Sequence, residues 1–519
     1  MALASQFSHI FPFLFLFHLF LTTQELQRLE LFSEADINIT NNAHPRLVQK
    51  RLRLPFAVDS GPPVEERGHY AGYYHLPHTR GARMFYFFFE SRTNKNDPVV
   101  IWLAGGPGCG GEIALFYENG PFHFAKNLSL VWNKYGWDKV SNLLYVDQPI
   151  GTGFSYTTND SDLRKNQNDV TNDLYDFLQD FFTEYREFDK HDFFITGESY
   201  AGHYAPALAS KILQENKDKR RIYIHLKGIA IGNGLINPGI QYPEQLSYAL
   251  SQTLIIDGSS DYLRIRGIVR KCKLSLKTCG AYSFNLLYVF RLFLVFFSQD
   301  YYLFGIYTLQ PVSFFLDADG DHVRCLLAAY DVCSKIMDEI LSVTGNINYY
   351  DIRKDCEGRL CYDFSNMEKL MNDESIKKSL GVGADIHFVS CNSTVSDNMK
   401  GDFMKNYQVG IPALLENGIK ILIYAGDKDV LCNWQGNLKW VLGMKWYGDK
   451  IFKALRPVDF FVDGDKVGEL RTHKHLSFVK INKAGHLVPM DQPKAALQMI
   501  ETWMQDRLSV SKHVFFSSS

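Results

Sequence analysis

Short apolar runs alternate with longer segments that have a helical repeat of apolar positions. Residues 99–103 are apolar at consecutive positions, which is typical of a parallel strand buried on both faces. Strands are also predicted at 69–76, 84–90, 142–146, 193–196, 228–231, 421–424 and 476–481, and helices at 168–185 and 493–507. This alternation predicts an α/β fold with a mostly parallel central sheet and helices on both faces, in which ligands bind beyond the carboxyl ends of the strands.

The spacing of apolar positions changes along the chain and indicates domain boundaries. The apolar run 11–21 is too short to span a bilayer and precedes polar residues, which favours a signal peptide over an uncleaved anchor. Clear buried strands are few between about 240 and 390, as expected for an insertion over the sheet. The predicted units are a signal peptide (1–23), a pro-segment or loose arm (24–67), a core in two parts (68–240 and 386–507), an inserted cap (241–385) and a tail (508–519).

Composition narrows the function classes. The chain has 519 residues with 55 basic and 57 acidic side chains, so nothing in its charge favours a nucleic-acid partner or an acidic substrate. Secretory entry agrees with the Asn-x-Ser/Thr sites at Asn38, Asn127, Asn159 and Asn392. The nine cysteines show no zinc-site spacing, and we predict no metal. In an oxidising compartment eight of them could form four disulfides.

A candidate nucleophile follows the apolar run 193–195. Ser199 lies in the sequence Gly197-Glu198-Ser199-Tyr200-Ala201-Gly202, between a predicted strand and a predicted helix. Small residues around a serine at such a bend are typical of a nucleophile elbow, which projects the hydroxyl out of the turn. An ordinary strand-to-helix turn is the alternative, and a serine becomes a strong nucleophile only when a base takes its proton.

The base and its orienting acid are expected on loops that follow later strands. His486 comes soon after the strand at 476–481, whereas His473 and His475 precede that strand or lie at its start. Asp427 and Asp429 both follow the strand at 421–424, and each could instead be a solvated loop carboxylate. The order Ser, Asp, His is that of the catalytic triad in hydrolases whose nucleophile lies at a sharp turn between a strand and a helix. The acid of such a triad fixes the tautomer of the imidazole.

An oxyanion hole can be formed by backbone N–H groups after the strand at 99–103. The glycine-rich segment 105–108 leaves the N–H of Gly106 unobstructed, and the N–H of Tyr200 could converge with it on a developing negative charge. A phosphate-binding loop is the alternative. It is disfavoured because no Lys-Ser/Thr pair follows the glycines.

Four segments in order, 102–109, 142–149, 197–204 and 485–489, resemble the serine carboxypeptidases. The chain looks most similar to plant serine carboxypeptidase-like proteins, over about residues 68–505. The resemblance implies an α/β-hydrolase fold and a catalytic triad of Ser199, Asp429 and His486, with Asp429 preferred over Asp427. It implies Gly106 and Tyr200 as oxyanion donors, and no cofactor.

The resemblance also implies a site for the terminal carboxylate of a substrate, formed by Glu118, Glu198 and the backbone of Gly105. Two adjacent carboxyl groups cannot easily both ionise, so one keeps a proton above its ordinary pKa. The protonated member can donate a hydrogen bond to a carboxylate, which predicts a peptidase most active at acid pH.

The family pattern further implies the disulfides Cys109–Cys391, Cys272–Cys333, Cys279–Cys325 and Cys356–Cys361. Cys432 is then free and three residues past Asp429. It could make the enzyme sensitive to thiol reagents, or be a buried structural cysteine.

The chain departs from the family pattern at three places. Ala104 stands where the family often has an asparagine that donates to the substrate carboxylate, and Gly110-Gly111 replaces Ser-Ser. Where the family has a short loop between Cys279 and Cys325, this chain has an aromatic-rich run at 284–297. Our hypothesis is that about 281–320 is translated intron or a wrongly assigned exon.

These observations favour a serine carboxypeptidase that acts on peptide or protein C-termini, in the vacuole or outside the cell. The alternatives are an acyltransferase of the same scaffold that uses glucose-ester donors, and a catalytically impaired glycoprotein. Glu198 favours the peptidase, because the acyltransferases tend to have aspartate there. No membrane span is expected after signal cleavage, and a homodimer and a monomer both stay open.

Overall fold

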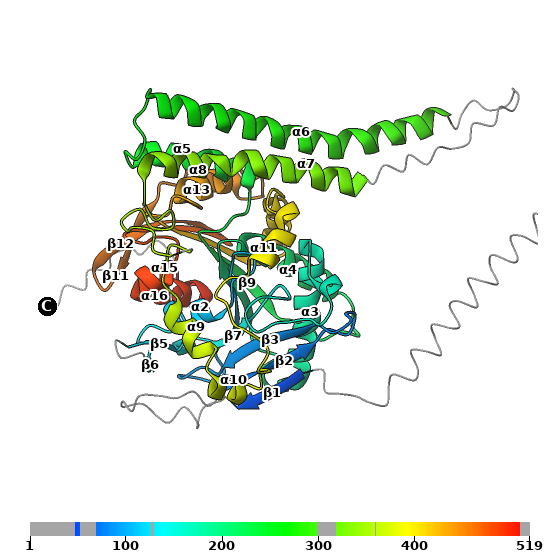
Figure 1. Ribbon diagram of the computed structural model, residues 1–519, viewed down its shortest axis with the longest axis vertical. Coiled ribbons are helices and arrows are strands. Elements are labelled where there is room, and N and C mark those ends of the chain that lie inside the picture. Colours follow the sequence, from blue (N-terminus) through cyan, green and yellow to red (C-terminus); the bar gives the residue numbers. More distant parts are fainter. Residues whose placement is uncertain (1–46, 52–68, 126–128, 298–317, 359, 509–519) are drawn as a thin grey trace, which may run out of the picture. The chain divides into compact units, whose positions relative to one another are not determined.

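The sheet is the framework of the protein. The computed structural model describes residues 47–51, 69–125, 129–297, 318–358 and 360–508, and within them an eleven-stranded sheet has the order β1-β2-β3-β7-β4-β8-β9-β10-β13-β12-β11 (Figure 1). Its strands are β1 (Leu47–Arg51), β2 (His69–His75), β3 (Arg83–Phe89), β4 (Val99–Leu103), β7 (Asn142–Val146), β8 (Phe193–Glu198), β9 (Leu226–Gly232), β10 (Lys420–Gly426), β11 (Val458–Val462), β12 (Asp465–His473) and β13 (Leu476–Ile481). A separate antiparallel pair consists of β5 (Phe122–Phe124) and β6 (Leu130–Trp132).

The expected parallel sheet with helices is confirmed at the centre, and antiparallel strands extend it on both flanks. Parallel pairing joins the six neighbouring strands β7-β4-β8-β9-β10-β13, and every other pairing in this sheet is antiparallel. On the flanks, short connections join β2 to β3, β11 to β12 and β12 to β13, and such connections permit only antiparallel pairing. The carboxyl ends of β4, β8, β9, β10 and β13 therefore lie at one edge of the sheet.

Helices cover both faces of the sheet. Successive residues of the central strands alternate between two apolar clusters, as in β8, where Phe193 and Ile195 belong to one cluster and Phe194 to the other. The first cluster includes residues of α3 (Gln167–Glu184), α4 (Ala201–Glu215), α12 (Ile411–Glu416) and α13 (Trp434–Gly443). The second includes residues of α2 (Glu112–Tyr117), α9 (Ser365–Met371), α10 (Glu374–Leu380) and α16 (Pro493–Met504). The core also contains the short helices α11 (Ser393–Asn398), α14 (Asp449–Ala454) and α15 (Val488–Asp491).

The segment predicted as a cap is helical. It contains α5 (Pro238–Ser251), α6 (Ser260–Phe297), α7 (Ala318–Cys333) and α8 (Lys335–Thr344). Figure 1 shows α6 and α7 side by side, and two disulfides, Cys272–Cys333 and Cys279–Cys325, join them. The backbone of α6 continues through the aromatic-rich run to Phe297. Residues 298–317 lie outside the described residues, so the origin of the insertion stays a prediction.

Two sheet elements were missed or misread in the sequence. Leu47–Arg51, expected in a loose arm, is an edge strand that pairs with β2. An edge strand is held by backbone hydrogen bonds on one side, so its polar sequence carries no burial pattern. The β11–β12 hairpin turns at Asp463 and Gly464, which both have positive φ (49° and 88°). An Asp-Gly pair between apolar runs is a strong hairpin signal, and could have revealed this element.

Several expectations fall outside the described residues: the signal peptide, the rest of the arm apart from β1, Asn38, Asn127 and nearly all of the tail. Within the described part of the chain, none of the helices is both long enough and apolar enough to cross a membrane.

Candidate active site

Ser199 lies in a strained turn at the carboxyl end of β8. Its φ is 59°, in the left-handed region that non-glycine residues seldom adopt. Its N–H donates to the carbonyl of Gly232 (3.0 Å), and its carbonyl accepts from Gly202 (3.0 Å) and Leu235 (2.8 Å). These bonds hold the turn between β8 and α4, so the predicted elbow is present.

The glycine-rich loop after β4 lies directly against this turn. A Cβ atom on Gly105 would lie 2.5 Å from the Cβ of Ser199 and 2.8 Å from the backbone nitrogen of Tyr200. Only glycine permits this approach, and Gly106 follows with a φ of 106°. Tyr200 is the N-cap residue of α4, where backbone N–H groups lack intrahelical partners. The loop and the helix start thus bring backbone donors close to Ser199.

His486 and Asp429 form a buried pair. The imidazole Nδ1 lies 2.7 Å from Oδ2 of Asp429, and the two side chains are 3% and 0% exposed. Because the carboxylate accepts a hydrogen bond from Nδ1–H, Nε2 is left as the basic nitrogen. Nε2 has no hydrogen-bond partner among the described residues, and His486 lines the same cavity as Ser199.

The competing candidates lie elsewhere. Asp427 does not line the cavity; its carboxylate lies 3.5 Å from Lys428, and its carbonyl accepts from Tyr248. His475 lies 3.1 Å from the hydroxyl of Tyr447, and His473 ends β12. The geometry therefore favours Asp429 and His486 in the order Ser, Asp, His.

Asn233 is a site residue that the sequence reasoning missed. Its Nδ2 donates to Oδ2 of Asp429 (2.7 Å), and its Oδ1 accepts from the N–H of Gly426 (2.9 Å). It is fully buried and has a φ of 39°, which asparagine tolerates better than most residues. Asp429 also accepts from the N–H of Leu431 (2.8 Å). A signal existed, since Asn233 lies between two glycines directly after a predicted strand.

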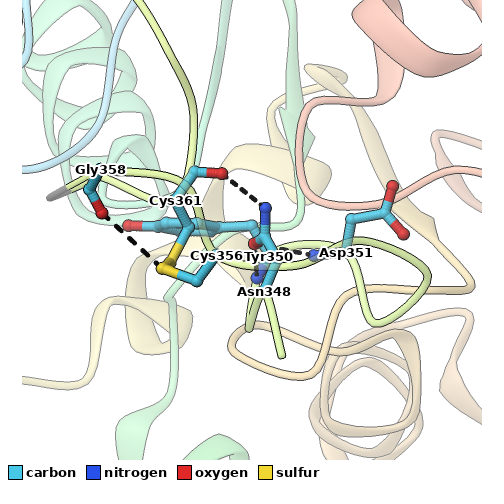
Figure 2. The surroundings of a disulfide bond; sticks show 6 residues. All are labelled: Asn348, Tyr350, Asp351, Cys356, Gly358 and Cys361. Atoms are coloured by element: carbon cyan, nitrogen blue, oxygen red, sulfur yellow. Dashed lines mark hydrogen bonds between the residues drawn. A yellow bond between two sulfur atoms is a disulfide. The ribbon is translucent and has the colours of Figure 1, made fainter. Parts of the chain in front are cut away.

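A second missed element joins the acid loop to the base loop. The carbonyl of Tyr349 accepts from the N–H of Leu431, and the carbonyl of Tyr350 accepts from the N–H of His486. The Tyr350 ring lies 4.9 Å from the imidazole, centroid to centroid. Figure 2 shows how Asn348 holds this segment: its Oδ1 accepts from Tyr350 (2.8 Å) and its Nδ2 donates to Cys361 (2.6 Å). The Cys356–Cys361 disulfide thus closes the loop that supports His486.

Glu118 and Glu198 are close together beside the nucleophile. Both are almost completely buried and line the same cavity, and a side-chain hydrogen bond joins them. Burial raises the pKa of both carboxyl groups well above the ordinary range, and the charge of Glu118 raises that of Glu198 further. The pair therefore keeps a proton where exposed carboxyl groups have lost theirs.

One cavity brings these groups together. Ser199, His486, Glu118, Glu198, Gly105 and Gly106 all contribute to its surface. Ala104 is also part of the wall, so no side-chain donor is present where the family often has asparagine. The predicted cap supplies an apolar and aromatic part of the wall: Tyr242, Tyr350, Leu360, Tyr362 and Phe364.

The cysteines pair as the family pattern implied, in four disulfides, and Cys432 is a free thiol. Cys432 is buried in the cavity wall, where burial raises the pKa of its thiol. Among the two described glycosylation candidates, both amide atoms of Asn392 form hydrogen bonds, to Gly151 and Thr394. Asn159 accepts from Ser161. Glycosylation at either position stays a prediction.

Comparison with known proteins agrees with this geometry. The family model "Serine carboxypeptidase" matches residues 61–506. The chain is 51% identical over 498 residues to serine carboxypeptidase-like 48 of Arabidopsis thaliana, covering 94% of this chain and 90% of the relative. It is 50% identical over 463 residues to serine carboxypeptidase 3 of Hordeum vulgare, covering 89% and 82%.

Among solved structures, a prohormone-processing carboxypeptidase from Saccharomyces cerevisiae is similar in fold. It matches with a TM-score of 0.70 at 24% identity, over 85% of this chain and 92% of that one. The sheet, its helices and the elbow thus form an α/β-hydrolase fold. The chain belongs to the serine carboxypeptidase family.

Proposed function

We propose that the protein is a serine carboxypeptidase that releases C-terminal amino acids from peptides through an acyl-enzyme, and that it is most active at acid pH. The observation that carries the proposal is the buried Glu118–Glu198 pair in the cavity that also contains Ser199 and His486. A nucleophile and base alone would suit many hydrolases. A carboxyl pair that keeps a proton is suited to substrates that end in a carboxylate.

The residues divide the reaction between them. The Oγ of Ser199 attacks the last peptide carbonyl while His486 takes its proton. Asp429 orients the imidazole and stabilises the imidazolium that forms. The N–H groups of Gly106 and Tyr200 bind the oxyanion. The C–N bond then breaks, His486 protonates the departing amine, and the free amino acid leaves. Water, activated by His486, hydrolyses the resulting ester and restores Ser199.

The carboxyl pair sets the direction of the pH dependence. Since burial raises the pKa of both members, the protonated pair persists above the ordinary carboxyl range. Each proton lost with rising pH removes a donor to the substrate carboxylate and adds a repelling charge. KM is therefore expected to rise with pH, which suits an enzyme of an acidic compartment such as the vacuole or the cell exterior.

The test compares a blocked dipeptide acid with its C-terminal amide across pH. The wild type should hydrolyse the acid more efficiently at low pH, and this preference should shrink as the pH rises. In Glu198→Gln, a permanent amide donor replaces the titrating group, so the change of KM with pH should be smaller. A fluorophosphonate, which has no carboxylate, should label Glu198→Gln like the wild type and leave Ser199→Ala unlabelled. Equal hydrolysis of acid and amide at every pH would refute the proposal.

A further inference from the structure

A second buried carboxyl pair lies at the base of the glycine-rich loop and has no part in the chemistry above. Glu112 is the first residue of α2, and Asp147 directly follows β7; they are 0% and 2% exposed. Gly106, the proposed oxyanion donor, lies on the loop that ends at Glu112. The pair is thus placed to influence Ser199 through the backbone rather than through the substrate.

Asp147 ties this loop to the sheet. Its Oδ1 accepts from the N–H of Gly111 (3.0 Å), and its Oδ2 accepts from the N–H of Phe154 (2.7 Å). Its own N–H donates to the carbonyl of Phe85 in β3 (2.9 Å), and its carbonyl accepts from the hydroxyl of Ser155 (2.6 Å). Two backbone donors on one buried carboxylate make Asp147 the member that carries the negative charge.

Glu112 is suited to carry the proton. Neither of its carboxyl oxygens has a hydrogen-bond partner among the described residues, and its Oε2 lies with Oδ1 of Asp147 around the same position, that of a Cβ on Gly110. Tyr73 of β2 lies near both carboxyl groups, and no cation of the described residues acts on either Glu112 or Asp147. Burial raises the pKa of Glu112, and the charge of Asp147 raises it further.

We propose that Glu112 and Asp147 share one proton and thereby position the oxyanion loop, and that loss of this proton at higher pH displaces the loop and slows the chemistry at Ser199. When the Glu112 proton passes to solvent, two negative charges face each other in a buried site without a cation. Separating them moves the start of α2 and the Gly111 N–H that Asp147 holds. The Cys109–Cys391 disulfide and the bond from Gly110 N–H to Ser390 (3.0 Å) retain the outer side of the loop, so the change is local.

The loop glycine next to the pair offers a precise perturbation. A Cβ on Gly110 would lie 2.5 Å from Oε2 of Glu112 and 3.5 Å from Oδ1 of Asp147. The nearest atom is the far end of a flexible side chain, which can move aside more easily than backbone. A serine there would place a hydroxyl donor beside Glu112 and favour its ionised form, whereas an alanine adds the same Cβ without a donor.

Glu112 and Asp147 do not line the described cavity, so their effect on Ser199 can be measured without a peptide. The measured quantities are the rate constant for labelling of Ser199 by a fluorophosphonate, and the apparent Tm, both across pH. A fluorophosphonate has no terminal carboxylate, so the Glu118–Glu198 pair does not enter. In the wild type, the rate should fall on the alkaline side by about tenfold per pH unit once the shared proton is lost.

Glu112→Gln should abolish this alkaline fall, because its amide donates to Asp147 at every pH. The stability change has a fixed sign: folded Glu112 keeps a proton that the unfolded chain has lost, so wild-type stability declines as the pH rises above the ordinary carboxyl range. In Glu112→Gln the decline of Tm with pH should be smaller. Coincident profiles for the wild type and Glu112→Gln would overturn the proposal.

A second pair of variants tests the proposal independently if Glu112→Gln does not fold. Gly110→Ser should make the alkaline fall begin at lower pH than in Gly110→Ala, because its hydroxyl stabilises the ionised form of Glu112. Identical profiles for these two variants would also count against the pair as the titrating group.

Discussion

Replacing Asn233 by glycine is expected to weaken the Asp429–His486 pair without changing the walls of the cavity. Asn233 does not line the described cavity, yet its amide spans Asp429 and the end of β10. Glycine removes the side chain and tolerates the φ of 39° at this position. Asn233→Ala is the matched variant, since it removes the same two bonds and adds backbone strain.

The structure gives the expected magnitudes. The hydrogen bond from Nδ2 to the Asp429 carboxylate contributes about 1.5–3 kcal/mol to the free energy of unfolding. Loss of the acceptor for the buried N–H of Gly426 costs about 1–3 kcal/mol more. Asn233→Gly should therefore lose about 3–5 kcal/mol of stability. Asn233→Ala should lose about 1–2 kcal/mol more, from its left-handed backbone. With one donor missing, the Asp429 carboxylate can rotate away from Nδ1, and we expect kcat to fall about tenfold, which corresponds to about 1.4 kcal/mol.

Steady-state kinetics on a blocked dipeptide and thermal unfolding test this reasoning. KM should stay within about twofold of the wild type, because the substrate contacts are untouched and only the chemical step is slowed. Fluorophosphonate labelling should slow in parallel with kcat. A folded Asn233→Gly variant with wild-type kcat would refute the role assigned to Asn233, and a rise in KM alone would place its effect on substrate binding.

The remaining predictions concern the cavity and the loop of the base. Ala104→Asn should raise kcat/KM for peptides with a free C-terminal carboxylate by about tenfold or more, because a donor to a charged group adds about 1.5–3 kcal/mol; fluorophosphonate labelling should not change. Gly485→Ala should lower kcat by at least about tenfold, since its Cβ would lie 2.5 Å from the carbonyl of Tyr350, which accepts from His486. Cys432 should react with iodoacetamide far more slowly than a free thiol, because burial raises its pKa and leaves little thiolate; rapid loss of activity on alkylation at neutral pH would contradict this.

How much of the site the sequence predicted depended on the kind of residue. Ser199 and His486 follow apolar runs that pack as central strands, so their position at the carboxyl edge of the sheet could be inferred. Asp427 and Asp429 lie two residues apart after one strand, and periodicity could not choose between them. Tertiary contacts distinguish them, since only Asp429 meets His486.

Residues that act through other residues were harder to find. Asn348 and Tyr350 lie in a segment without a motif, and they gain a role only because folding places that segment between the Asp429 and His486 loops. Leu47–Arg51 was misread for a related reason, since its partner is the backbone of β2 rather than an apolar face.

The sequence by itself determined the central strands, the elbow at Ser199 and the family. Each of these depends on local patterns: apolar runs, small residues at a bend, and motifs a few residues long. The family pattern implied the Glu118–Glu198 pair, whereas only the tertiary structure brought Glu112 and Asp147 together and showed that both pairs are buried. Glu118 and Glu198 lie 80 positions apart and Glu112 and Asp147 lie 35 apart, so their proximity comes from the packing of α2 against the sheet. Burial beside a second carboxyl group, which no local pattern records, is what makes them acids at a pH where exposed carboxyl groups are ionised.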